Sequence, residues 1–589
     1  MNFIKNVLAT ILGLILFCFL SFFVLLIIGS AISMGSSSPN VSLKNNSVIK
    51  LDLSGITHDY GGSIYIKDLD YRETSKDGLI DVLFAIDHAK TDANIKGISI
   101  ENNLSSLGFT QRKALREKLE EFKKTGKFVL SYADNYMQSE YYLNSVADTI
   151  YLNPLGTIDF KGLSTEILYM KDLQEKTGIQ MEVVRHGKYK SAVEPYLQQE
   201  MSPENREQNL ELLQSMWNSI VNDIAESRKI STEQLNHIAT HLNARNAELA
   251  LENKMIDKIA YIDEYKQAIR KSLGLKKEED INEIEIEDYI QAILPTLKNK
   301  AKDQIAVIFA QGTILGGEGS VDVIGEKSIN KALKEARDNA NIKAVVVRVN
   351  SPGGSALVSE IIWREIELTK KVKPVIVSMG DVAASGGYYI ASNADYIFAE
   401  PTTITGSIGV FGTLPNVRNL AKRVGVNAEQ VQTHPHAVTY SVFEPLSDMT
   451  QQTLTESIEH IYDVFLQRVA TGRKMSKEEV NEIAQGRIWT GVMAKENGLV
   501  DELGGLNDAI NYAAKQVEIS DYRVTLYPEY EMEFKDLLRK MLGFSVKQAQ
   551  QNTIIEQIGK ENYEILKQIN YLQQSSGVQA LLPYQMIIK

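Results

Sequence analysis

The sequence predicts an α/β protein in which one folding unit occurs twice in tandem, behind a helix that crosses a membrane. Three observations lead to this fold class. A chain of 589 residues is too long for one hydrophobic core and predicts at least two domains. Residues 93–96 (Ala-Asn-Ile-Lys) recur as residues 340–343, and apolar strand-like runs alternate with helical patterns around both. A long apolar segment without charges begins the chain.

This apolar segment spans residues 7–34. A bilayer core about 30 Å thick needs roughly 20 apolar residues in a helix, so the segment is long enough to cross it. A cleaved secretory signal would have a shorter apolar region, of about 7–15 residues. We therefore expect an uncleaved single-pass anchor, with residues 1–6 in the cytoplasm, residues 35–47 as a polar stalk and the rest of the chain outside.

The repeat extends well beyond four matching residues. The same offset of 247 positions also aligns residues 127–130 with 374–377, Tyr141-Tyr142 with Tyr388-Tyr389, and Pro154 with Pro401. Alternating strands and helices within each copy predict parallel strands joined by crossover helices. The predicted parts are a first copy at 48–275, a connector at 276–302, a second copy at 303–525 and a helical carboxyl-terminal tail at 526–589.

Ser385 marks the most informative difference between the copies. It lies in a turn of small residues between a strand-like run and a helix start, where its backbone can approach a substrate closely. The first copy has Gln138 at the aligned position, and it also lacks the glycine pair Gly353 and Gly354. Backbone N–H groups from this pair and from Gly386 could form an oxyanion hole. A glycine-rich turn that only packs a helix on a sheet is the alternative.

A reactive serine needs a base, and the histidines are poor candidates. His237 and His241 share one face of a predicted helix, but no third ligand accompanies them, so no metal site is expected. Ser385 is not part of a Gly-x-Ser-x-Gly elbow, for which a histidine base would be usual. The alternative base is a lysine whose pKa is lowered by burial.

Composition excludes several other classes of protein. The single cysteine, Cys18, rules out intrachain disulfides and cysteine-based metal sites, and we expect no cofactor. A formal net charge of −12 argues against a nucleic-acid partner.

Three motifs in one order give the chain a close resemblance to a known family. They are Gly-Lys-Tyr-Lys-Ser-Ala-Val-Glu-Pro at 187–195, Val-Ala-Ala-Ser-Gly-Gly-Tyr at 382–388 and Thr-Gly-Ser-Ile-Gly at 405–409. The chain resembles the long, two-domain form of bacterial signal peptide peptidase A (protease IV). The resemblance implies a Clp-protease/crotonase-like fold in each copy and a homo-oligomeric ring, a tetramer in this family.

The resemblance also implies roles for particular residues in a membrane-bound serine endopeptidase. Ser385 would be the nucleophile, Lys190 the general base, and Ser407 would orient the lysine. Gly353, Gly354 and Gly386 would lie at the oxyanion, and the choice between the first two stays open. The expected substrates are cleaved signal peptides and other unfolded apolar peptides, at the outer (periplasmic) face of the bacterial inner membrane.

The repeat supports Lys190 independently. When Glu194-Pro195 is aligned with Glu444-Pro445, Lys190 falls on Tyr440, and no lysine or arginine occurs between residues 424 and 467. The first copy therefore has the lysine without the serine, and the second has the serine without the lysine. Neither half should be active alone, and we favour a site formed within one chain over one formed between subunits. A non-catalytic membrane scaffold and a crotonase-like acyl-thioester enzyme are the alternative functions.

Overall fold

The computed structural model describes residues 13–17, 19–20, 43–294, 301–533 and 577–581. Residues 13–17 and 19–20 are helical, and the remainder of the predicted anchor at 7–34 lies outside the described residues. Within these described ranges, no helix combines the length and the apolar character that crossing a bilayer requires.

The first copy is built on a six-stranded sheet in the order β10-β7-β5-β4-β1-β11. All neighbouring strands in it are parallel, as the alternation of strands and helices predicted. The strands are β1 (Ser47–Lys50), β4 (Ile95–Glu101), β5 (Phe128–Ala133), β7 (Thr149–Leu152), β10 (Lys258–Ile259) and β11 (Asn282–Glu285).

The main helices of the first copy pack on this sheet through apolar stripes. In α3, Leu115, Leu119 and Phe122 recur at helical spacing and are fully buried in the first core. The helices are α2 (Leu79–Ala89), α3 (Phe109–Lys123), α4 (Gln138–Asn144), α5 (Lys171–Thr177), α6 (Glu194–Leu197), α7 (Pro203–Arg228), α8 (Thr232–His241), α9 (Ala247–Glu252), α10 (Ile262–Ser272) and α11 (Ile286–Ile293), with 3-10 turns η1 (Lys67–Leu69) and η2 (Ser191–Val193).

The second copy has an eight-stranded sheet in which the order β22-β20-β18-β16-β12-β24 is extended by β19 beside β18 and β23 beside β19. Every residue of β12 is buried, because this continuous apolar run is a strand covered on both faces. Only β20 and β22 pair antiparallel in this sheet. The strands are β12 (Gln304–Gln311), β16 (Ile342–Ser351), β18 (Val375–Ala384), β19 (Tyr396–Ala399), β20 (Ile404–Gly406), β22 (Ile488–Thr490), β23 (Glu502–Leu503) and β24 (Arg523–Tyr527).

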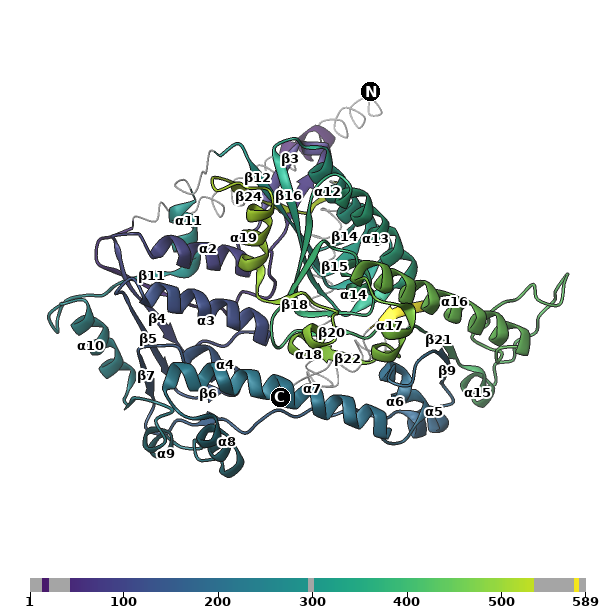
Figure 1. Cartoon of the computed structure of the whole chain (residues 1–589), viewed down its shortest axis with the longest axis horizontal. Helices are drawn as coiled ribbons and strands as arrows, with labels where there is room; N and C mark the ends of the chain where they lie inside the picture. The colour runs from purple at the N-terminus through teal and green to yellow at the C-terminus, as the bar shows by residue number, and fades with distance from the viewer. Residues whose placement is uncertain (1–12, 18, 21–42, 295–300, 534–576, 582–589) are drawn as a thin grey trace, which may run out of the picture.

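The helices of the second copy follow the order of the first. They are α12 (Glu326–Asp338), α13 (Ala356–Lys370), α14 (Gly386–Ala391), α15 (Arg418–Arg423), α16 (Asp448–Arg473), α17 (Lys477–Ile483), α18 (Gly491–Glu496) and α19 (Leu506–Gln516). In Figure 1 the main sheet of the first copy lies on the left and the second copy lies to its right, while β9 (Gln180–Arg185), α5 and α6 of the first copy reach across to the lower right, beside β21 (Phe411–Asn416).

The correspondence between the copies reaches the ends of single helices. The long helices α7 and α16 both begin after a serine, Ser202 or Ser447, whose side chain accepts a backbone N–H three residues on. Both end at a lysine with a φ of 57°, Lys229 or Lys474. Together with the matching strand order, these details confirm the predicted tandem α/β repeat.

A third sheet joins the two copies, in the order β14-β15-β13-β17-β26-β21-β9. Strand β9 (Gln180–Arg185) belongs to the first copy and pairs antiparallel with β21 (Phe411–Asn416) of the second. Two small sheets accompany it, β25-β2-β3 and β6-β8. The remaining strands are β2 (Ser63–Ile66), β3 (Tyr71–Thr74), β6 (Tyr136–Met137), β8 (Ile158–Asp159), β13 (Thr313–Leu315), β14 (Gly319–Ser320), β15 (Val323–Gly325), β17 (Gly353–Ser355), β25 (Glu529–Met532) and β26 (Gly577–Leu581).

Two segments outside the predicted copies contribute to the fold. In the predicted connector at 276–302, β11 pairs with β1, and α11 buries four side chains in or against the first core, so this part completes the first copy. The tail at 526–589 was predicted to be helical, but its described parts contain strands β25 and β26, because both pair with edges of existing strands. Residues 534–576 and 582–589 of the predicted tail lie outside the described residues.

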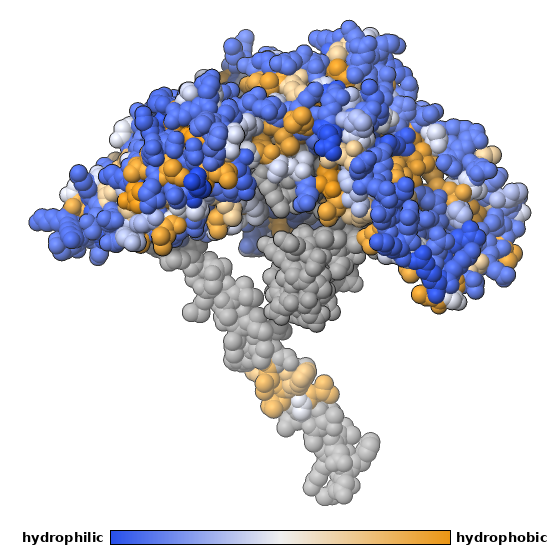
Figure 2. Space-filling view, turned by 90° about the horizontal axis from the view of Figure 1, so that it is seen from below, coloured by the Kyte–Doolittle hydropathy of each residue, from blue (hydrophilic) through white to orange (hydrophobic). Residues whose placement is uncertain are grey.

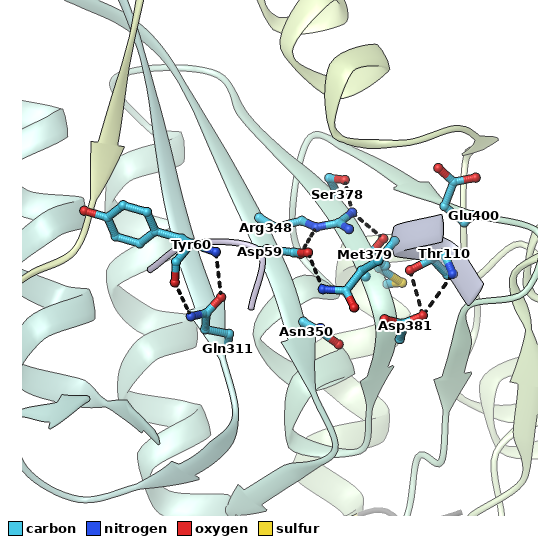
Figure 3. A network of polar contacts seen from close by, with 12 residues as sticks. Asp59, Tyr60, Thr110, Gln311, Arg348, Asn350, Ser378, Met379, Asp381 and Glu400 are labelled. Atoms are coloured by element: carbon cyan, nitrogen blue, oxygen red, sulfur yellow. Dashed lines mark hydrogen bonds and ion pairs between the residues drawn. The ribbon is translucent and has the colours of Figure 1, made fainter. Parts of the chain in front are cut away.

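A buried polar network links the copies next to the end of β18 (Figure 3). The carboxylate of Asp59, from the first copy, accepts hydrogen bonds of 2.7 Å from Arg348 Nε and from Gln111 Nε2. Asp381 in β18 accepts 2.9 Å hydrogen bonds from both the N–H and the hydroxyl of Thr110. The first copy therefore holds the strand of the second copy that leads into the candidate site.

The surface seen in Figure 2 is mostly hydrophilic, with hydrophobic side chains in small separate patches. The short described helix at 13–17 is different, because its neighbouring large apolar side chains are exposed, Leu16 at 64% and Phe17 at 70%. Adjacent exposed apolar side chains of this size mark a surface that another apolar phase or protein covers.

Candidate active site

Ser385 lies between the end of β18 and the start of α14 in a strained backbone conformation. Its φ is 54° and its ψ is −115°, a region that residues with a Cβ rarely occupy. Its N–H donates to the carbonyl of Gly406 at 2.8 Å, and its carbonyl accepts the N–H of Tyr389 at 2.8 Å. The surrounding structure therefore holds a fully buried serine hydroxyl at a sharp strand-to-helix turn.

The two glycines after Ser385 are required by close packing. A Cβ on Gly387 would lie 2.6 Å from the carbonyl oxygen of Ser351, and one on Gly386 would lie 2.7 Å from Oγ of Ser359. Neither space admits a side chain, so the sequence Ser-Gly-Gly lets α14 begin against β16 and α13.

Lys190 reaches the same place from the first copy. It follows β9, occupies the N-cap position of the 3-10 turn η2 and is fully buried. Two glycines of the second copy make room for it. A Cβ on Gly486 would lie 2.6 Å from Cβ of Lys190, and one on Gly409 would lie 3.2 Å from its Cδ.

The amine of Lys190 joins Ser385 to Ser407. Its Nζ lies 2.8 Å from Oγ of Ser385, 3.0 Å from Oγ of Ser407 and 3.1 Å from the carbonyl oxygen of Ser407. All three residues are fully buried, and all belong to one chain. The structure thus brings together the three side chains that the sequence singled out, across 195 positions between Lys190 and Ser385.

Burial alone lowers the pKa of Lys190 well below its ordinary value. The cause is the loss of hydration of the ammonium, which makes the neutral amine the favoured form. The carbonyl of Ser407 can only accept hydrogen bonds, so it takes one N–H of that amine. The lone pair of a neutral Lys190 is then available to the hydroxyl of Ser385.

Ser407 is itself held in an unusual conformation, with a φ of 50°. Its N–H donates to the carbonyl of Arg487 at 2.7 Å, directly after Gly486. The turn that makes room for Lys190 is therefore also the turn that holds Ser407.

The predicted oxyanion glycines occupy two different places. A Cβ on Gly353 would lie 2.7 Å from the backbone nitrogen of Gly386, so these two residues adjoin each other beside Ser385. Gly354 packs on the other side, where a Cβ would lie 2.8 Å from the backbone nitrogen of Ile314 in β13. The N–H of Gly353 donates to Oγ of Ser351 at 3.1 Å.

Gly409 and Gly486 are the site residues that sequence reasoning missed. Gly409 stands in the third motif, two positions after Ser407, and that position was a usable signal. Gly486 lies in no recognised motif, and only the tertiary contact with Lys190 reveals its role. Across the described ranges, no group of three or more His, Cys, Asp or Glu residues is arranged to hold a metal ion.

A buried, strained serine hydroxyl lies beside a buried lysine amine on an α/β scaffold, which is the arrangement that a nucleophile with an adjacent base requires. The sequence matches Peptidase family S49 at residues 121–276 and again at 367–520, once in each copy. The chain belongs to this family, and it is a serine peptidase. Membership of a peptidase family supports neither the scaffold nor the acyl-thioester alternative.

The chain is similar to curated proteins over most of its length. It is 38% identical to Protease 4 of Haemophilus influenzae over 80% of this chain and 79% of that protein. It is 35% identical to Protease 4 of Salmonella typhi over 90% of this chain and 88% of that protein. It is 33% identical to the chloroplastic serine protease SPPA of Arabidopsis thaliana over 74% of this chain and 66% of that protein. These relatives support the resemblance to the long form of signal peptide peptidase A.

Proposed function

We propose that Ser385 and Lys190 are the catalytic dyad of this serine endopeptidase, and that both come from the same chain. The distance of 2.8 Å between Lys190 Nζ and Ser385 Oγ, inside a fully buried site, carries the proposal. Neutral Lys190 takes the hydroxyl proton as Ser385 attacks the peptide carbonyl, and it then gives that proton to the leaving amine. An ester with Ser385 forms and is hydrolysed by water.

The neighbouring residues have supporting roles in this mechanism. Ser407 orients Lys190, because it binds the amine through both its hydroxyl and its carbonyl. Gly353 and Gly386 adjoin each other beside Ser385, which favours a place for the substrate oxyanion between them. Gly354 is the weaker candidate, since it packs against Ile314.

The proposed substrates are extended, apolar peptides, including cleaved signal peptides, at the outer face of the bacterial inner membrane. The charge-free segment 7–34 and the exposed Leu16 and Phe17 support a membrane anchor with the catalytic copies outside. The name of a shorter relative from Enterococcus faecium, putative signal peptide peptidase SppA, is consistent with such substrates. Each copy would have a Clp-protease/crotonase-like fold, and the chains would form a ring.

An activity-based probe for nucleophilic serines tests the dyad directly. The full chain should be labelled at Ser385, and both Ser385→Ala and Lys190→Ala should abolish the labelling. Lys188→Ala is the matched control, because Lys188 is exposed two positions away and should not affect labelling. Equal labelling of the wild type and Lys190→Ala would exclude Lys190 as the base.

Mixed oligomers test whether the dyad lies within one chain. Lys190→Ala and Ser385→Ala proteins are dissociated, mixed and reassembled, and peptide hydrolysis is measured. We expect no recovery, because each chain supplies its own lysine to its own serine. Recovered activity would show instead that the dyad crosses between subunits.

A further inference from the structure

Strand β18 has a bulge just before the turn that holds Ser385. Residues 376–379 of the strand pair with β19, whereas residues 382–384 pair with β20. On the other side the register against β16 shifts at the same place, so that residues 380–382 are opposite Asn350 alone. A bulge bends its strand and changes the direction of the residues that follow. The shape of this bulge therefore affects where the strand delivers Ser385.

Three side chains hold the bulge in place. Two of them belong to the second copy, since Asn350 accepts a hydrogen bond from a backbone N–H of the bulge at 3.1 Å and Thr403 donates one to a backbone carbonyl of the bulge at 2.8 Å. The third side chain, Asp381, reaches the first copy instead (Figure 3). Its Oδ1 accepts both the N–H and the hydroxyl of Thr110 in α3, each at 2.9 Å. The strand that carries the nucleophile is thus fastened to the other copy at its bulge.

Asp381 supplies the amino-terminal cap that α3 does not have in its own sequence. The N-cap residue of α3 is Gly108, which has no side chain to accept the free N–H groups of the first turn. A Cβ on Gly108 would collide with the carboxylate of Asp381, so this carboxylate occupies the space of a capping side chain. Helix α13, the counterpart of α3 in the second copy, has Ser355 at the aligned position, and this serine accepts the N–H of Val358 at 3.4 Å. The second copy therefore caps both helices.

The aligned aspartate of the first copy has a different use. The offset of 247 positions places Asp134 on Asp381. Asp134 accepts hydrogen bonds from Asn102, Tyr132 and Asn153, all of which belong to its own copy. The aspartate on the nucleophile's strand therefore joins the two copies, while its counterpart serves the fold of one copy.

We propose that Asp381 is a positioning residue of the dyad, an inference that rests on the peptidase function proposed above. Its carboxylate caps α3 of the first copy and so fixes the bulge from which β18 enters the strained turn at Ser385. The same contact holds the bulge relative to the copy that supplies Lys190. A shift of about 1 Å between reacting groups can cost about 10²-fold in rate. Asp381 acts through the backbone of its strand, so it affects the rate of the reaction rather than the binding of substrate.

Steady-state hydrolysis of a fluorogenic apolar peptide by the purified full chain in detergent tests the proposal. Asp381→Ala should lower kcat by about 10–100-fold and leave KM nearly unchanged. Asp381→Asn keeps an oxygen that can accept both hydrogen bonds from Thr110, so this variant should retain most of kcat. Asp134→Ala is the matched control at the aligned position of the other copy, and it should retain kcat. An unchanged kcat in Asp381→Ala, or an equal loss in Asp134→Ala, would overturn the positioning role.

Thr110→Val tests the same contact from the first copy. It removes the hydroxyl donor but keeps the backbone N–H, so kcat should fall by about fivefold, the equivalent of one hydrogen bond. This loss should disappear in an Asp381→Ala background, because the acceptor is then absent.

Urea denaturation checks that each variant folds. An unchanged kcat in folded Thr110→Val would overturn the positioning role even where Asp381→Ala fails to fold. The serine probe separates this inference from the proposed function. A wild type that is not labelled at Ser385 would overturn the dyad and the positioning role together. A labelled wild type in which Thr110→Val costs the same with and without Asp381 would overturn the positioning role alone.

Discussion

The two copies fold alike but build the turn before one helix differently. In the second copy Ser385 has a φ of 54° and precedes α14, whereas in the first copy Met137 has a φ of −66° and Gln138 is simply the first residue of α4. The amide of Gln138 accepts the N–H groups of Lys161 and Gly162 and donates to the carbonyl of Gly162. In the first copy the side chain of Gln138 makes its hydrogen bonds within its own copy. In the second copy the hydroxyl of Ser385, in a strained turn, contacts Lys190 of the first copy.

The segment with β9 and Lys190 differs in the opposite sense, because here the first copy contributes to the site and the second does not. In the first copy, β9 crosses to β21 and delivers Lys190 to the second copy. In the second copy the corresponding stretch forms no strand between residues 424 and 447, and Val431 in it is fully exposed. Tyr440, which aligns with Lys190, donates its hydroxyl to the carbonyl of Pro415 in its own copy. Duplication therefore allowed each copy to keep one half of a single site.

Removal of either half of the dyad should have the largest effect. Ser385→Ala should reduce peptide hydrolysis to background, because no nucleophile remains. Lys190→Ala should lower kcat by about 10²–10⁴-fold, the usual contribution of a general base. Steady-state kinetics on an apolar peptide measures both, with Lys188→Ala as the control. A Ser385→Ala variant that keeps most of its activity would contradict the assignment of the nucleophile to the second copy.

The pH dependence of activity should follow Lys190. Burial lowers the pKa of Lys190, and only the neutral amine accepts a proton, so kcat/KM should rise with pH through that pKa and stay high on the alkaline side. The free energy of unfolding should rise with pH from that lowered pKa up to the ordinary pKa of lysine, because in this range the unfolded chain binds the proton and the folded chain does not. An activity maximum below about pH 6 would contradict a lysine base.

Loss of the orienting hydroxyl should cost less than loss of either dyad member. Ser407→Ala removes the 3.0 Å hydrogen bond to Lys190 Nζ but keeps the one to the backbone carbonyl of residue 407. One hydrogen bond of this kind contributes about 1 kcal/mol, so we expect a loss of roughly fivefold in kcat. The rising limb of the pH profile should remain. A loss as large as that of Lys190→Ala would give Ser407 a direct part in the reaction.

The smallest effect on activity is expected in the first copy. Gln138→Ser places a serine at the aligned position, but no strained turn holds it there, and Lys190 stays bound to Ser407 in the second copy. The change should not restore hydrolysis to a Ser385→Ala protein. It should lower the free energy of unfolding by about 1 kcal/mol, because the half-buried backbone N–H groups of the 161–162 turn lose their hydrogen-bond partner. Urea denaturation measures this, and recovered hydrolysis would contradict the asymmetry.

Sequence alone gave the duplication and the three side chains that meet in the site. A fixed offset was enough to align Ser385 with Gln138, and motif order connected Lys190 and Ser407 to it. These signals are local in sequence, so they can be read without a structure. The strand formed by residues 282–285 was assigned to the connector, because its sequence, Asn-Glu-Ile-Glu, is mostly polar. Only one of its four residues is buried in the structure.

The contacts that sequence could not give are those set by distant parts of the chain. Strand β26 pairs with residues more than 150 positions away, and nothing in its composition names β17 and β21 as its neighbours. Gly486 likewise has a φ of 80°, which favours glycine, and Lys190 from the other copy passes close beside it. Choosing Gly353 over Gly354 also required the position of Gly386 in three dimensions.

The separation of Lys190 from Ser385 in the sequence determines when the site can form during synthesis of the chain. The 195 positions between them take about 10–40 s to translate at roughly 5–20 residues per second. The turn at 485–487, which supports both Lys190 and Ser407, is made later still. A nascent chain therefore carries Lys190 without a complete site until residues 485–487 have been made.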